Sequence, residues 1–278
     1  MATAKPSPET TQAVQGAPLV TGDFTKQLKH TTSLRVVKVI DAQTILMNDG
    51  KIVRLSGIGY PFIAGTNDSD VALTAKLLLE KLLAAGTDVL VYQTRKQTEG
   101  RVNRMGHLLA HLVTKKNGEW INGVLLKEGL AWAEPDALNP QMAAQMYALE
   151  QQAREAKKFI WSDKSPYGVL TPETAARGAG TFRVIEGTVK RASTSKNSLF
   201  LNFGTDWRKD FTVMVSPAVR KALSREGVDP IGLTGRKIRV RGWLREWNGP
   251  FLELETPERL EILSAASASS APPAENGQ

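Results

Sequence analysis

The chain of 278 residues contains no cysteine, only three histidines and no long apolar run. Without cysteine it cannot have a disulfide framework, a thiolate nucleophile or a zinc site with cysteine ligands. His30 is far from His107 and His111 in the sequence, which argues against a three-histidine zinc site. A membrane-spanning helix needs roughly eighteen consecutive apolar residues, and no segment approaches this. We therefore expect neither a zinc cofactor nor a membrane partner.

The sequence indicates the compartment only weakly, because proteins without thiols occur in cytosol and periplasm alike. No apolar stretch typical of a secretory signal follows Met1. We expect a cytoplasmic protein, and a periplasmic or secreted one if a signal peptide has been removed.

Composition predicts two folded domains between two tails. The length is too great for one small module, and 41% hydrophobic with 23% charged residues is near the globular average. Residues 1–33 are predicted to be a flexible tail and residues 264–278 a disordered one, because few large apolar groups occur in either. The predicted domains are 34–163 and 181–263, joined by a Pro- and Gly-containing linker over 164–180.

The formal net charge of +8 favours polyanionic partners. Residues 34–163 carry 16 basic and 14 acidic side chains, whereas residues 181–263 carry 15 basic and 10 acidic ones. The second domain is therefore the better candidate for a surface that faces phosphates.

The first domain is predicted to be α+β. Apolar alternation indicates strands over 34–40, 44–47 and 52–58, with a hairpin turn at Asp49-Gly50. Further strands over 89–93 and 108–113 and helices over 121–128 and 140–158 follow. A helix after Asp68 or Ser69 is expected to bury an apolar stripe, which consists of Val71, Leu73, Leu77, Leu78 and Leu82.

The second domain is predicted to be a small closed β-barrel. Short strands are expected over 182–190, 198–203, 211–215, 238–243, 251–254 and 260–263, with one helix over 217–226.

Five segments of the first domain resemble the sequence motifs of a known protein family. They are VVKVIDAQTI (36–45), VRLSGIGYP (53–61), NRMGHLLAHL (103–112), the Trp120 to Ala131 segment and LEQQAREAKKFIW (149–161). In order and content this domain resembles the staphylococcal nuclease family. The resemblance implies a five-stranded oligonucleotide-binding-type (OB-type) barrel with three helices, and calcium-dependent cleavage of phosphodiester bonds.

The residues that the family uses for calcium are not matched. Where typical members read Asp-Gly-Asp-Thr, this chain reads Asp41-Ala42-Gln43-Thr44, so that neutral Gln43 stands at a metal-ligand position. Gly59 and Phe62 stand where the family has a second metal carboxylate and the general-base glutamate. Because calcium requires several oxygen ligands and hydrolysis requires a base, we expect no calcium and no family-type hydrolysis.

One phosphate-binding arginine of the family is matched by Arg54, and the other aligns with His107. An acid–base pair of His107 with Arg54 and Asp41, acting on RNA without a metal, is one interpretation. A surface histidine that replaces an arginine is the simpler interpretation.

The second domain contains EGTV (186–189) and the segments 198–215 and 233–263. On these segments it is similar to a small barrel that follows nuclease-like domains in some bacterial proteins. Its segment 236–245 alternates basic residues with Ile238, Val240 and Trp243, so several guanidinium groups, among Arg239, Arg241 and Arg245, are predicted to share one face of a barrel that also exposes an aromatic ring. Such a face fits single-stranded nucleic acid, whereas pairing of these arginines with glutamates is the structural alternative.

Other candidates for nucleic-acid contact are Trp207, Trp247 and the basic loop with Arg101 and Arg104. Trp207 is expected to close a barrel end rather than stack on a base, and one of Trp243 and Trp247 to pack across the Asn248-Gly249 hairpin.

The sequence thus predicts a nuclease-like protein that binds single-stranded DNA or RNA and is catalytically inactive. An active metal-dependent phosphodiesterase and a scaffold that binds protein partners are the alternatives.

Overall fold

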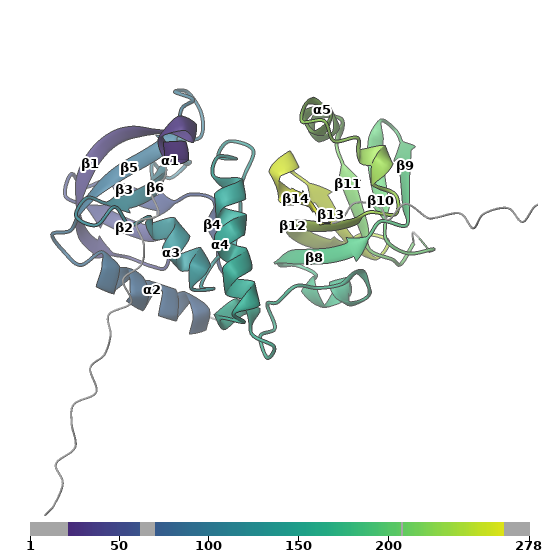
Figure 1. The fold of residues 1–278 in the computed structure, drawn as a ribbon, viewed down its shortest axis with the longest axis horizontal. Helices are drawn as coiled ribbons and strands as arrows, with labels where there is room; N and C mark the ends of the chain where they lie inside the picture. The colour runs from purple at the N-terminus through teal and green to yellow at the C-terminus, as the bar shows by residue number, and fades with distance from the viewer. Residues whose placement is uncertain (1–21, 62–69, 207, 264–278) are drawn as a thin grey trace, which may run out of the picture.

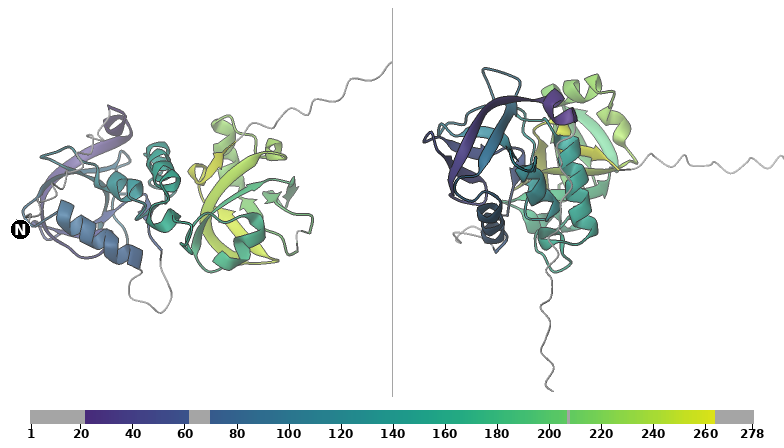
Figure 2. Two further views of the ribbon diagram at one scale, coloured as in Figure 1. Left: turned by 60° about the horizontal axis from the view of Figure 1, so that its bottom comes forward. Right: turned by 60° about the vertical axis from the view of Figure 1, so that its left-hand side comes forward.

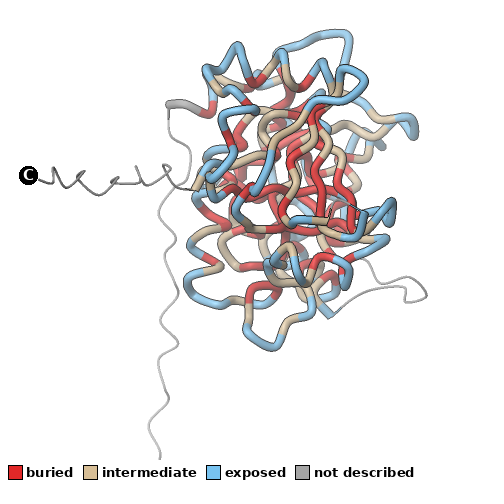
Figure 3. Tube along the Cα trace, turned by 90° about the vertical axis from the view of Figure 1, so that its right-hand side faces the viewer, coloured by how far each residue is buried: buried red, intermediate tan, exposed pale blue. Residues whose placement is uncertain are grey.

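The computed structural model describes residues 22–61, 70–206 and 208–263, which form two domains side by side (Figure 1). Figure 3 shows buried segments concentrated in the sheets and exposed ones at the turns. No helix in these ranges has the length and apolar character needed to cross a membrane.

The first domain is built on a closed barrel of five strands in the order β1-β2-β3-β6-β5. The strands are β1 (Leu28–Val39), β2 (Thr44–Met47), β3 (Ile52–Leu55), β5 (Asp88–Thr94) and β6 (Leu108–Thr114). Strand β3 runs parallel to β6, and all other neighbours are antiparallel. The predicted hairpin turn is confirmed, and Gly50 adopts the positive φ of 78° that this turn requires.

The expected flexible tail over 1–33 is wrong for its last twelve residues, 22–33, which are folded. Helix α1 (Gly22–Gln27) precedes β1, and β1 pairs with β5 from Leu28 onwards. Phe24 is fully buried against Tyr92 and Trp120. Burial of one large apolar residue can anchor a segment that is otherwise polar. The average composition of residues 1–33 does not reveal such an anchor.

Three longer helices surround this barrel, as expected: α2 (Asp70–Leu82), α3 (Ile121–Lys127) and α4 (Ala143–Glu155). A second small sheet pairs β4 (Ile58–Gly59) with β7 (Trp132–Ala133), and η1 (Phe159–Trp161), a 3-10 turn, follows α4. The expected stripe on α2 is partly wrong, because Leu73 and Leu77 are 50% and 58% exposed. The helix buries Ala72, Ala75 and Leu79 instead.

The second domain is a sheet of seven strands with one helix, α5 (Pro217–Arg225). The strands are β8 (Phe182–Thr188), β9 (Arg191–Ser195), β10 (Ser198–Asn202), β11 (Thr212–Val215), β12 (Lys237–Glu246), β13 (Pro250–Leu254) and β14 (Leu260–Ile262). Their order is β14-β12-β13-β11-β10-β9, and β8 pairs with β12. The predicted closure into a barrel is not found in this described sheet, and β9 was not predicted.

The segment expected to be a linker, 164–180, folds against the second domain. Its 3-10 turn η2 (Pro172–Gly178) has a capping box between Thr171 and Thr174. Residues Leu170 and Ile185 form a bridge, and two further 3-10 turns, η3 (Pro230–Leu233) and η4 (Pro257–Arg259), complete the domain.

Helix α4 lies between the two sheets (Figures 1 and 2). An apolar cluster joins Trp132, Ile160 and Trp161 of the first domain to Phe182 and Val184 of the second. The two domains are therefore packed against each other through a buried interface.

Candidate functional site

Gln43, at the position of a family metal ligand, has a structural role in this chain. Its side chain is 6% exposed, and Nε2 donates hydrogen bonds to the main-chain oxygens of Leu55 (2.8 Å) and Ile58 (2.6 Å). Neighbouring Asp41 accepts a hydrogen bond from the Gln43 main-chain N–H at 2.8 Å. The amide thus fastens β3 to the segment that follows it, a task that a carboxylate, which accepts but does not donate, cannot perform.

The space beside Gly59 is occupied by another residue, Glu134. A Cβ at Gly59 would lie 1.9 Å from Glu134 Oε2, so no side chain fits there unless Glu134 moves. Glu134 directly follows β7, and its N–H donates to the Gly57 oxygen at 2.7 Å. Burial raises the pKa of Glu134, while the charges of Arg259 and Arg54 oppose this rise. The sequence comparison with the family missed this carboxylate, because Glu134 comes from a segment 75 residues further along the chain.

Arg54 lies on the outer side of the barrel. Its neighbours Val53 and Leu55 are buried in the core, and Arg54 itself is half-buried, opposite Thr44 of β2 and Leu109 of β6. Within the described residues it forms no hydrogen bond or ion pair. Its charge acts on the nearby Glu134 carboxyl, and its donors are open to a further anionic ligand.

His107 lies just before β6, on the same side of the sheet as Arg54 according to strand parity. Its Nδ1 is buried without a hydrogen-bond partner among the described residues. His111 has the same parity but is buried: Trp120 Nε1 donates to its Nδ1 at 3.3 Å, and burial lowers the pKa of His111 to about 3. Of the two histidines, only His107 is therefore partly exposed on the side of Arg54.

These residues do not fit the calcium site that the resemblance implies. Gln43 directs its N–H groups at the two nearest carbonyl oxygens, and Gly59 supplies no ligand. Across the described ranges, no three histidine or carboxylate side chains converge in a way that suits a metal ion. Phe62, at the general-base position, lies outside the described residues.

The prediction that Arg239 and Arg241 face a nucleic acid is wrong, because both are buried. Arg239 binds Glu186 (2.6 Å) and Glu261 (3.1 Å), the residues directly opposite it on β8 and β14. Arg241 is 0% exposed and binds Glu150 of α4 at 2.9 Å and Glu261 at 2.5 Å. The alternation along β12 was read correctly, but α4 of the first domain covers the polar face.

The C-terminal end of the polar face of β12 is exposed. Arg245 lies 3.9 Å from Glu253 with its side chain 67% exposed, and Trp243 is 47% exposed. Trp247 is 58% exposed, and its ring meets Phe251 edge-on with centroids 4.9 Å apart. Trp207 lies outside the described residues.

The basic loop of the first domain is held in place by its own arginines. Arg101 Nε donates to the Thr94 oxygen at 3.0 Å, and Arg95 Nε donates to the Lys26 oxygen at 3.0 Å. Arg104 is exposed and forms no ion pair with a described residue. Of the two predicted contact residues, Arg101 therefore has a structural role and Arg104 is accessible.

The closed five-stranded barrel with helices on its outside defines the first domain as an OB-type fold. A family model described as staphylococcal nuclease homologue matches residues 52–163. The first domain is therefore a staphylococcal nuclease-like domain. The matched range contains Arg54, Gly59 and His107 but begins after Gln43. A search of curated proteins gives no match to the chain.

Proposed function

We propose that this protein binds single-stranded DNA or RNA and does not hydrolyse it. One observation carries the proposal: Arg54, the counterpart of a phosphate-binding arginine, forms no hydrogen bond or ion pair with a described residue, while Gln43 and Gly59, at the family's metal-ligand positions, supply no metal ligand. The chain thus keeps a cation that attracts phosphate but not the family's metal ligands, and Glu134, the carboxylate in the space beside Gly59, lies 3.9 Å from Arg259.

Two further features support binding rather than catalysis. OB-type barrels hold single strands by pairing phosphates with cations and stacking bases on aromatic rings. The chain carries a net charge of +8, and Arg104 and Arg245 are exposed. By contrast, removal of a single stabilising group from such a hydrolytic site costs a factor of about 100 or more, and several are missing here.

The salt dependence of binding tests the role of Arg54. We expect a labelled single strand of twenty nucleotides to bind the full chain at low salt, and log Kd to rise with log salt. In Arg54→Gln, one phosphate contact is lost, so the slope should fall by roughly 0.7. Arg35→Gln is the control, because Arg35 is also a strand arginine but is paired with Asp88 at 2.9 Å.

An unchanged slope in Arg54→Gln would remove Arg54 from the contact surface. Absence of binding by the parent chain to both DNA and RNA at low salt would contradict the proposed function and favour a protein-binding scaffold.

A further inference from the structure

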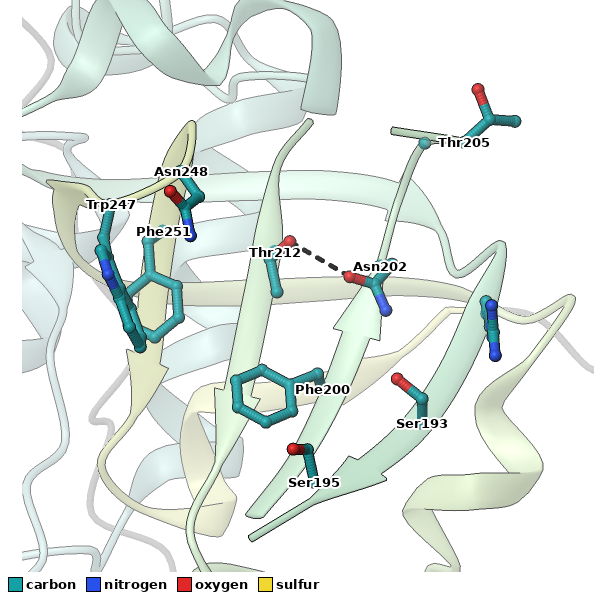
Figure 4. A pocket seen from close by; sticks show the side chains of 11 residues that line it. Ser193, Ser195, Phe200, Asn202, Thr205, Thr212, Trp247, Asn248 and Phe251 are labelled. Carbon is teal, nitrogen blue, oxygen red and sulfur yellow. Dashed lines mark hydrogen bonds between the residues drawn. The ribbon is translucent and has the colours of Figure 1, made fainter. Parts of the chain in front are cut away.

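A cavity of about 400 Å³ opens on the second domain, away from the nuclease-like site. Strands β9, β10 and β11 and the hairpin between β12 and β13 form its walls (Figure 4). The family resemblance of the first domain assigns nothing to this cavity, and the sequence pattern indicated only one of its residues, Trp247.

One end of the cavity is aromatic. Trp247 is 58% exposed, and Phe251 beneath it is 5% exposed and contacts the indole edge-on. The strand order places Phe200 of β10 across β11 from this pair, as Figure 4 shows. Phe251 thus packs against the Trp247 ring, and more than half of Trp247 stays exposed to a flat ligand.

The other end of the cavity is polar. Asn202 Oδ1 accepts a hydrogen bond from Thr212 Oγ1 at 3.3 Å, which leaves the Nδ2 group directed elsewhere. Within the described residues, neither this Nδ2 nor the hydroxyls of Ser193 and Ser195 donate a hydrogen bond. Asn202 therefore lies two strands from Phe251, and the serine hydroxyls of β9 lie one strand further.

The rim of the cavity carries a positive charge. Arg191 of β9 lines the cavity, is exposed and has no ion pair with any described residue. It belongs to the second domain, whose residues 181–263 carry 15 basic and 10 acidic side chains. This charge distinguishes a phosphate-bearing ligand from a neutral sugar, for which aromatic and amide groups alone would suffice.

We infer that this cavity holds one nucleobase of a bound single strand, stacked on Trp247, with its polar edge toward Asn202 and an adjacent phosphate at Arg191. The inference rests on the proposed function, because it assumes that single strands bind to this protein. It adds a site in the second domain, at a surface different from the buried arginines of β12.

Fluorescence anisotropy with a labelled single strand of ten nucleotides tests this site in the full chain. In Trp247→Ala, we expect affinity to fall about tenfold with the salt slope unchanged, because stacking displaces no counterion. Trp247→Phe should keep most of the affinity. The control is Phe159→Ala, an aromatic residue of the first domain that is 49% exposed and lies outside the cavity, which should bind as the parent does.

The charge at the rim needs a separate variant. Arg191→Gln should lower the salt slope by roughly 0.7, whereas Arg225→Gln, an exposed arginine on α5, should not change it. Unchanged melting temperatures would show that each variant is folded.

Two results would overturn the inference. The first is parent-like binding by both Trp247→Ala and Arg191→Gln while the parent binds, which would leave the proposed function standing and remove only this site. The second is binding of a neutral oligosaccharide that Trp247→Ala abolishes, with no effect on nucleic acid. If the parent bound no single strand, the proposed function would fail first.

Discussion

Single residues decide what the nuclease-like site can do, and most of them could be predicted from the sequence. Gln43 and Gly59 stand out as uncharged once the resemblance fixes the register of the motifs. The sequence could not show that Gln43 binds two carbonyl oxygens or that Glu134 occupies the space beside Gly59. These contacts join segments whose proximity follows only from the closed barrel.

A single residue, His111, makes the stability of the folded protein depend on pH. Burial lowers its pKa from 6.5 to about 3, so above pH 6.5 the imidazole is neutral in both folded and unfolded chains. As the pH falls below 6.5, the unfolded chain takes up a proton that the folded chain excludes, and stability decreases. The expected loss is about 1.4 kcal/mol per pH unit until the pH nears 3.

The free energy of urea unfolding is measured at pH 7.0, 6.0 and 5.5 for the parent chain and for His111→Gln. Glutamine is chosen because its amide oxygen can also accept a hydrogen bond from Trp120. The variant should lose stability less steeply below pH 6.5. Glu134 and other groups act in both proteins alike, so the difference isolates His111. Equal slopes would mean that the imidazole is protonated in the folded protein.

At the scale of elements, periodicity predicted which segments are helices and strands better than it predicted which faces are covered. The helix at α2 was expected, but with Leu77 buried, because leucine was assumed to point to the core. Alanine residues instead allow α2 to approach the barrel closely, and Leu79 fills the remaining space. Similarly, β12 has the predicted alternation but lies against α4.

Two alanine substitutions on α2 test this orientation. Leu79→Ala removes a fully buried side chain and should cost about 2–5 kcal/mol through lost burial and a cavity. Leu77→Ala, at a 58% exposed position, should change stability by less than about 0.5 kcal/mol. Urea denaturation measures both, and equal losses would mean that the helix is rotated about its axis.

On the scale of the whole molecule, the two domains share a buried ionic centre. Arg241 of the second domain donates to Glu150 and to the Ala133 oxygen of the first, and its guanidinium stacks 4.0 Å from the Tyr147 ring. Burial alone would lower the pKa of Arg241, but the carboxylates of Glu150 and Glu261 outweigh this and raise it. No sequence pattern revealed this pairing, because its partners are 91 residues apart.

Removal of Arg241 should therefore weaken the whole protein. Arg241→Met leaves the buried Glu150 carboxylate with less compensation, and we expect a loss of about 3–5 kcal/mol. Arg245→Met, on the same face of β12 but exposed, should have almost no effect. Calorimetry should show one unfolding transition for the parent, and two well-separated transitions would contradict a shared interface.

The central claim is that this nuclease-like protein holds single strands without cutting them. The most direct measurement incubates the purified chain with end-labelled single-stranded DNA and RNA, with calcium or with chelator, and resolves the products on both native and denaturing gels. We predict a retarded complex on the native gel and full-length strands on the denaturing gel under both conditions. Calcium-dependent shortening of the strands, abolished by chelator, would contradict the account.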